Sequence, residues 1–320
     1  MAENPDLKAL SGKILAVLGP TGCGKSAFSI ELALSIPSEI ISSDSMAVYR
    51  GVEIGTDKVP AASRRGIPHH LYDVAEPGTF FSAGLFRAMA TDVIEGIRSR
   101  NRLPILVGGT GLYARSLLEG IASAPSRDEA LRARLKERSM RKGLPSLYRI
   151  LRRLDGRRAL DVSPNDEIRI VRSLEIRILT GKPFSLVMEE GRNPAAQDAF
   201  KICLTLPRPL LYRRIEERVD RMVSLGLVEE ARSLWMSDRL SGPIAKAIGY
   251  KELVPHFEGR ASLADSIEEI KKNSRNLAKR QLTWFRKENG LEWVRMEDEH
   301  ERLGIREKVT RWLKGERYDR

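Results

Sequence analysis

The sequence predicts an α/β protein in which helices flank a parallel sheet and an all-helical subdomain is inserted into the chain. Short apolar runs typical of buried strands, such as Ile14–Leu18, alternate with longer helical patterns near both ends. Between Ser126 and Thr180 such runs are absent, and leucine recurs at helical spacing among many arginines. A chain of 320 residues can hold one large domain or two smaller ones. We therefore expect a core of residues 1–122 and 200–320, and an inserted helical subdomain of residues 123–199.

The first predicted strand leads into a glycine-rich loop, Gly-Pro-Thr-Gly-Cys-Gly-Lys-Ser, at residues 19–26. It fits the pattern G-x-x-x-x-G-K-[ST], with a strand before it and a helix after it. The glycines let successive backbone N–H groups point at one phosphate, and the helix start adds its positive dipole end. Lys25 supplies a mobile positive charge, and the Ser26 hydroxyl can hold Mg²⁺. The sequence thus predicts a P-loop NTPase-like core that binds a di- or triphosphate with Mg²⁺. The residues expected to bind it are Gly19, Thr21, Gly22, Cys23, Gly24, Lys25 and Ser26.

An acidic residue ends the second predicted strand, Glu39–Asp44. In open parallel sheets, ligands bind at the carboxyl ends of the strands, so Asp44 is expected beside the phosphate loop. A surface turn is the alternative interpretation. His69 and His70 point to opposite sides of an extended chain, so we expect packing or hydrogen bonding near the site from them and not a shared metal.

The third buried strand, Leu103–Val107, follows a predicted helix over Phe80–Arg100 and ends in glycines. A nucleotide hydrolase usually has a carboxylate for its magnesium shell at this point, and its absence disfavours a motor or hydrolase. Gly108, Gly109 and Gly111 are instead expected to allow close approach of a second ligand.

Charge is concentrated in the helical insertion. The chain carries a formal charge of +12, and residues 126–180 hold fifteen Arg and Lys against eight Asp and Glu. A polyanionic partner is one interpretation, and a solvated charged face without a ligand is the other. The two cysteines, Cys23 and Cys203, show no spacing for a disulfide framework or metal cage, and no apolar run reaches the length of a membrane span. We expect a cytoplasmic protein.

The last third of the chain is expected to complete the sheet. Phe200–Leu206 is the next strand, and a helix starting at Pro209 carries a row of arginines suited either to clamping diphosphate oxygens or to surface salt bridges. Leu227–Met236 and the basic stretch Ala264–Lys287 are predicted helices. Leu291–Val294 is expected to be the last strand, followed by a polar tail.

Six blocks together resemble the tRNA dimethylallyltransferase (tRNA isopentenyltransferase) family in its bacterial form. In order, they span residues 19–26, 44–51, 68–71, 107–113, 249–252 and 278–286. With their spacing, the resemblance covers residues 14–287. It implies transfer of the dimethylallyl group from dimethylallyl diphosphate to N6 of adenine 37 in the tRNA anticodon loop, giving N6-(dimethylallyl)adenosine and diphosphate. The phosphate loop would then hold an isoprenoid diphosphate in place of ATP.

The resemblance also implies roles for particular residues. Asp44 matches the general base, and Thr110 is expected to contact the substrates near the reacting centre. Arg214 and Arg218 match arginines assigned to diphosphate or tRNA phosphate. The expected tRNA contacts are Asp44, Ser45, Met46, Ala47, Ile168, Arg169, Arg172, Lys279 and Arg280. Ala47 and Ile168 stand where the family usually has Gln, which puts specific base contacts in doubt. We expect a monomer that acts on the tRNA anticodon stem-loop.

Three rival functions share part of this pattern. A transferase acting on free adenine nucleotides would use the same chemistry without a basic insertion. A small-molecule kinase would also need the phosphate loop, magnesium and an Asp. A nucleic-acid-binding NTPase would release phosphate without an isoprenoid, although the strand at residues 103–107 lacks its usual carboxylate.

Overall fold

The computed structural model describes residues 12–120, 125–190 and 198–316. The chain divides into two compact units, one made of residues 1–118 and 196–320 and the other of residues 119–195. The expected boundary at residues 122–123 lies outside the described residues. The first unit contains the sheet, and the second is helical throughout its described part.

The described strands form one parallel sheet in the order β3-β2-β4-β1-β5-β6. Their bounds are β1 Lys13–Leu18, β2 Ser38–Ser42, β3 His69–His70, β4 Leu103–Gly108, β5 Asp198–Thr205 and β6 Leu291–Arg295. The neighbours β2, β4 and β1 are central and buried along almost their whole length. Because these strands run parallel, the loops that follow them lie at one edge of the sheet. The predicted α/β fold is thus confirmed, and this edge carries the phosphate loop, Asp44 and Thr110.

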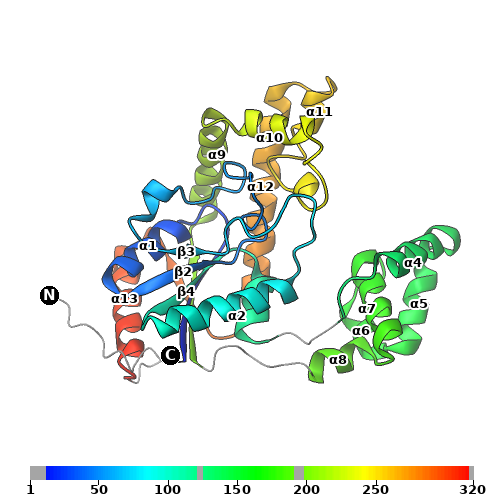
Figure 1. Ribbon diagram of the computed structural model, residues 1–320, viewed down its shortest axis with the longest axis horizontal. Coiled ribbons are helices and arrows are strands. Elements are labelled where there is room, and N and C mark those ends of the chain that lie inside the picture. Colours follow the sequence, from blue (N-terminus) through cyan, green and yellow to red (C-terminus); the bar gives the residue numbers. More distant parts are fainter. Residues whose placement is uncertain (1–11, 121–124, 191–197, 317–320) are drawn as a thin grey trace. The chain divides into compact units, whose positions relative to one another are not determined.

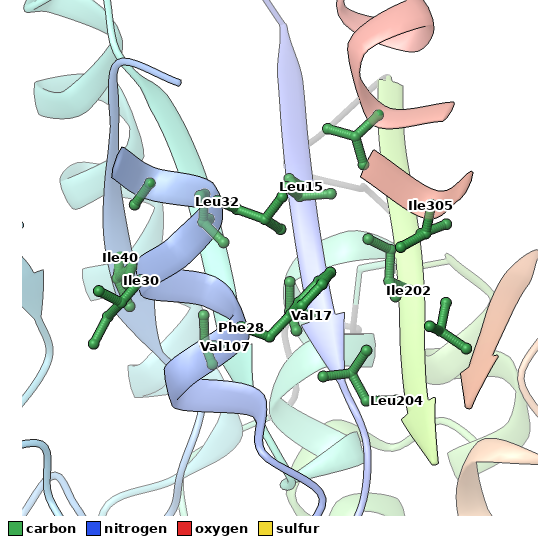
Figure 2. Packing of buried hydrophobic residues seen from close by; sticks show 14 of the residues in the cluster. Leu15, Val17, Phe28, Ile30, Leu32, Ile40, Val107, Ile202, Leu204 and Ile305 are labelled. Atoms are coloured by element: carbon green, nitrogen blue, oxygen red, sulfur yellow. The ribbon is translucent and has the colours of Figure 1, made fainter. Parts of the chain in front are cut away.

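Helices cover the sheet on both faces (Figure 1). On one face, Leu15 and Val17 of β1 pack with Phe28 of α1 (Lys25–Ser35) in a single buried cluster (Figure 2). The same cluster includes Ile305 of α13 (Glu299–Leu313). On the other face, α2 (Ala83–Ser99) lies against β2 and β4 and contacts α3 (Gly111–Leu118). The Ser82 hydroxyl accepts a hydrogen bond from the Leu85 N–H, which explains why α2 begins after Ser82 and not at Phe80.

The segment between β5 and β6 is mainly helical. Its elements are α9 Arg208–Ser224, α10 Leu227–Met236, η3 Ile244–Lys246, α11 Val254–Phe257 and α12 Leu263–Phe285. Helices α9 and α12 lie against each other. A short turn of 3-10 helix, η2 (Ala61–Arg64), lies between β2 and β3. Among the described residues, no helix combines the length and the apolar character needed to cross a membrane.

The polar tail expected after the last strand is wrong, because residues 299–313 form α13. Ile305, Val309 and Trp312 are at most 4% exposed. The Trp312 indole N–H donates to Asp198 Oδ1 at 2.8 Å, which links α13 to the start of β5. These apolar residues recur every three or four positions, so they form a helical stripe that the many intervening charges obscure.

The helical unit is built from five described helices around its own core. They are α4 Glu129–Lys142, α5 Leu144–Leu154, α6 Gly156–Asp161, α7 Glu167–Thr180 and α8 Phe184–Glu190. Leu147, Leu151 and Ile170 are at most 1% exposed in this core. The leucine and isoleucine spacing of the sequence thus corresponds to real helix faces.

The two adjacent histidines form the short edge strand β3. His70 Nε2 lies 2.7 Å from Glu39 Oε2, and His69 Nδ1 lies 2.9 Å from the Ile67 carbonyl oxygen. Burial acts to raise the pKa of the Glu39 carboxyl, but hydrogen bonds from Arg100 and His70 outweigh it and lower this pKa. Glu39 lies near the start of β2, so this hydrogen bonding is not beside Asp44, which follows the other end of the strand.

Candidate active site

The phosphate loop has the backbone conformation that its glycines allow. Gly19, Gly22 and Gly24 have φ values of 143°, 82° and 93°, a region that other residues rarely adopt. A Cβ on Gly19 would also lie 2.5 Å from the Leu204 carbonyl oxygen. Helix α1 begins at Lys25, and no side chain caps its first N–H groups. These donors and the positive end of the helix are therefore suited to an anion.

The loop's side chains differ in what they can contribute. The Lys25 ammonium group donates to the Pro20 carbonyl oxygen at 2.7 Å, across the loop. Burial raises the pKa of the Cys23 thiol, against the nearby charge of Lys25. Cys23 is fully buried, so it remains a neutral thiol and offers an anion only its backbone N–H.

Ser26 is exposed at the first turn of α1 and is suited to a magnesium ion. No cluster of three or more His, Cys, Asp or Glu side chains that could hold a metal occurs in the part of the chain that the structure describes. Mg²⁺ often takes only one or two protein ligands and completes its shell with phosphate oxygens and water. A single hydroxyl beside a diphosphate therefore fits this ion.

Helix α9 brings two of the predicted arginines to the loop. The Arg218 guanidinium donates to the Thr21 hydroxyl and pairs with Asp57, with 3.0 Å between Nε and Oδ2. Arg214 Nη1 lies 3.9 Å from the position that a Cβ on Gly24 would take. Both positive charges thus border the loop, on the side opposite to no strand partner but next to α1 and β5 through the packing of Gly22 on Ile215.

Asp44 follows β2 and has one carboxylate oxygen free. Its Oδ1 accepts hydrogen bonds from the backbone N–H groups of Met46, at 2.8 Å, and Ala47, at 3.3 Å. The other oxygen, Oδ2, has no hydrogen-bond partner among the described residues. Burial, together with the nearby charge of Asp44, raises the pKa of Tyr72 to about 12, and the same two causes contribute to a raised pKa at Tyr113. Asp44 therefore has neutral phenols near it and an oxygen available for a proton.

Thr110 connects the end of β4 to the turn that contains Asp44. Its backbone N–H donates to the Ser43 carbonyl oxygen at 3.2 Å. Its hydroxyl accepts from the Ser45 N–H at 3.1 Å and donates to the Ser45 hydroxyl at 3.3 Å. The structure thus brings Thr110 beside Asp44, where its hydroxyl supports the turn.

The interpretation of Gly108, Gly109 and Gly111 as space for a second ligand needs correction. A Cβ on Gly108 would lie 2.2 Å from the Ser43 carbonyl oxygen. On Gly109 it would lie 2.3 Å from Gln281 Nε2, and on Gly111 it would lie 2.2 Å from the Trp284 ring. These glycines make room for the chain's own residues, which the sequence pattern did not reveal because α12 lies more than 150 residues away.

Gln281 is a site residue that the sequence reasoning missed. Its Oε1 accepts a hydrogen bond from the Thr21 N–H at 2.9 Å, and its Nε2 donates to the Gly109 carbonyl oxygen at 3.1 Å. The available signal was its position next to Lys279 and Arg280 in one of the blocks that carry the family resemblance.

The expected RNA-contact residues occupy varied surroundings. In the sheet unit, Ser45 and Met46 are half-buried beside Asp44, whereas Ala47 is only 3% exposed. A contact at position 47 would therefore have to use the backbone. Lys279 and Arg280 on α12 are exposed and have no ion-pair partner among the described residues.

The charges near the start of α12 are largely neutralised. Lys271 pairs with Asp220 at 2.8 Å, and Arg275 pairs with Glu216 at 2.6 Å. Both acids lie on α9. The positive surface that the sequence assigns to the whole stretch 271–287 is therefore concentrated in its second half.

In the helical unit, the three predicted contact residues lie on α7. Ile168 is 78% exposed, and Arg169 pairs with Asp166 at 3.3 Å. Arg172 donates to Glu175 at 2.6 Å and to the Pro125 carbonyl oxygen at 2.8 Å. Arg172 is thus already engaged within its own unit.

Comparisons with known proteins agree with one another. The family model described as IPP transferase matches residues 47–288. The tRNA dimethylallyltransferase of Geobacter metallireducens is 45% identical over 284 residues, which is 88% of this chain and 92% of that protein. The tRNA dimethylallyltransferase of Geobacillus thermodenitrificans is 42% identical over 96% of this chain and 98% of its own length.

Solved structures show the same relationship. The tRNA isopentenylpyrophosphate transferase of Bacillus halodurans is 38% identical, with a TM-score of 0.71 over 95% of this chain and 98% of that one. A eukaryotic dimethylallyltransferase described as acting on tRNA is 27% identical, with a TM-score of 0.82 over 96% of this chain and 81% of that one. With a parallel sheet, a phosphate loop and these relatives, the chain belongs to the tRNA dimethylallyltransferase (IPP transferase) family.

Proposed function

We propose that this protein transfers the dimethylallyl group of dimethylallyl diphosphate to N6 of adenine 37 in the tRNA anticodon loop. The observation that carries the proposal is the shared edge of β1, β4 and β2, where an anion-binding loop and a carboxylate with a free oxygen follow neighbouring strands. The names of the relatives support tRNA as the acceptor. The exposed charges of Lys279 and Arg280 are suited to RNA phosphates.

The reaction breaks the C–O bond between the allylic carbon and diphosphate and forms a C–N bond to adenine. As the C–O bond breaks, negative charge grows on the diphosphate, and Lys25, Arg214 and the N–H groups at the start of α1 stabilise it. Mg²⁺ held at Ser26 would neutralise part of the same charge. The bonding electron pair leaves with the diphosphate.

The adenine amine must lose a proton as its nitrogen bonds to the allylic carbon. Its lone pair is delocalised into the ring, so it is a weak nucleophile, and a nearby base assists it. Asp44 is the candidate base, with Oδ2 as the accepting atom, because its Oδ1 is held by two backbone N–H groups. To reach it, the base must leave its stack, at a cost of a few kcal/mol that contacts to the RNA offset.

The test is incubation with unmodified tRNA and dimethylallyl diphosphate, followed by nucleoside mass analysis. We expect N6-(dimethylallyl)adenosine at position 37 and an equal amount of diphosphate. Asp44→Asn keeps an acceptor for the Met46 N–H and removes the base, so turnover should fall about a hundredfold or more with tRNA binding retained. Asp92→Asn, on the exposed surface of α2, is the matched control.

Three results would refute the proposal. They are equal prenylation of free AMP, phosphorylation of a metabolite with ATP, and RNA-stimulated ATP hydrolysis without prenyl transfer. We also propose that the reaction occurs in the cytoplasm and that a single chain suffices, because Lys25, Asp44 and Thr110 come from one unit of one chain.

A further inference from the structure

Gln281 connects two loops that the strand hydrogen bonds no longer hold together. Strands β1 and β4 pair up to Leu18 and Gly108. Beyond that register, the Gln281 amide continues the connection, accepting from the Thr21 N–H at 2.9 Å and donating to the Gly109 carbonyl oxygen at 3.1 Å. A backbone N–H can only donate and a carbonyl oxygen can only accept, so this orientation of the amide is the one that satisfies both.

The connection continues to the carboxylate. Thr110 follows Gly109, and its backbone N–H donates to the Ser43 carbonyl oxygen at 3.2 Å. Its hydroxyl accepts from the Ser45 N–H at 3.1 Å. Ser43 and Ser45 flank Asp44, so an unbroken series of hydrogen bonds runs from the phosphate loop, through Gln281, to both sides of the proposed base.

The residue types along this series fit a close approach. A Cβ on Gly109 would lie 2.3 Å from Gln281 Nε2 and 3.4 Å from the Gly19 carbonyl oxygen. Glycine at 109 is therefore required for the amide to reach across. Gln281 itself is half-buried on α12, a helix whose backbone holds the side chain in place.

We propose that Gln281 is a positioning residue that sets the distance between the bound diphosphate and the Asp44 carboxylate. This proposal rests on the proposed function. Gln281 does not touch the reacting atoms; it holds the two loops that do. Because transfer needs the allylic carbon, the amine and the base in one geometry, a shift of about 1 Å between the loops can cost about a hundredfold in rate.

The decisive experiment measures kcat, KM for dimethylallyl diphosphate and melting temperature in two variants. Gln281→Met keeps the length of the side chain and removes both hydrogen bonds. Gln281→Asn keeps the amide but is one methylene too short to reach both partners. We expect kcat to fall about tenfold to a hundredfold in both variants, with KM changed less than about threefold. The control is Asn276→Met, which removes an exposed amide from the same helix and should leave all three quantities unchanged.

The outcomes separate this proposal from its alternatives. A lower melting temperature with unchanged kcat would assign Gln281 a structural role only and overturn the proposal. A rise in KM alone would make it a diphosphate-binding residue and would also overturn it. Full activity in Gln281→Asn would show that bridging both loops is unnecessary. If the wild-type protein transfers no prenyl group to tRNA, the proposed function fails, and that result is visible before any variant is compared.

Discussion

Glu175 offers the sharpest test of how the helical unit is held together. It is fully buried, and its carboxylate accepts two hydrogen bonds from Arg132 at 2.8 Å and one from Arg172 at 2.6 Å. The backbone N–H of Asp128, which begins α4, donates to it at 2.8 Å. Burial acts to raise the pKa of Glu175, but these hydrogen bonds outweigh it and lower the pKa to about 2.

The size of the effect follows from this shift. Relative to the ordinary pKa of 4.5, the charged form is favoured in the folded state by roughly 3 kcal/mol, at about 1.4 kcal/mol for each pH unit. Removing one partner of a buried ion pair costs about 3–5 kcal/mol. We therefore expect Glu175→Gln to lower the free energy of unfolding of the helical unit by about 3 kcal/mol at neutral pH.

The positions of the tryptophans make the assay specific. All four lie in the sheet unit, at Trp235, Trp284, Trp293 and Trp312. In urea denaturation of the full chain, circular dichroism reports both units, whereas tryptophan fluorescence reports the sheet unit. Glu175→Gln should shift a transition seen by circular dichroism and leave the fluorescence transition in place.

The matched control and the pH dependence complete the test. Glu189→Gln removes an exposed partner of Arg157 in the same unit and should cost less than about 1 kcal/mol. The folded-state pKa of Glu175 is lowered, so its stabilisation is present above pH 4.5 and is lost as the pH falls towards 2. Equal destabilisation by the two variants at neutral pH would refute this account of the Glu175 cluster.

Three further predictions concern the sheet unit and its partner. Gly111→Ala should cost about 1–3 kcal/mol and shift the tryptophan emission, because its Cβ would lie 2.2 Å from the Trp284 ring, whereas Gly304→Ala, in open space on α13, should be neutral or slightly stabilising; equal effects would contradict this. Lys58→Met should speed amide exchange over residues 49–58, because the buried ammonium group pairs with Asp73 and bonds the Tyr49 carbonyl oxygen; unchanged exchange would exclude that role. Binding to tRNA should weaken linearly with the logarithm of salt concentration in filter binding, and a flat response would argue against contacts to RNA phosphates.

Local patterns explain what could be predicted. The strand before Gly19, the positive φ of its glycines and the helix at Lys25 follow from residues that are neighbours in sequence. The placement of Asp44 followed from a general property of parallel sheets, since each strand delivers its next residue to the same edge. The helix α13 was missed because its few buried residues are separated by charged ones, so the average polarity outweighed the periodicity.

The sequence by itself determined the fold class, the phosphate loop, the acid after β2 and the family, because each depends on short segments whose spacing is visible in one dimension. The tertiary structure alone decided which groups meet: Gln281 with Thr21 and Gly109, and Arg172 with Glu175. The reason is physical. Such hydrogen bonds form between side chains and backbone groups brought together by packing, and the same Gln or Arg on an exposed helix would leave an identical local pattern.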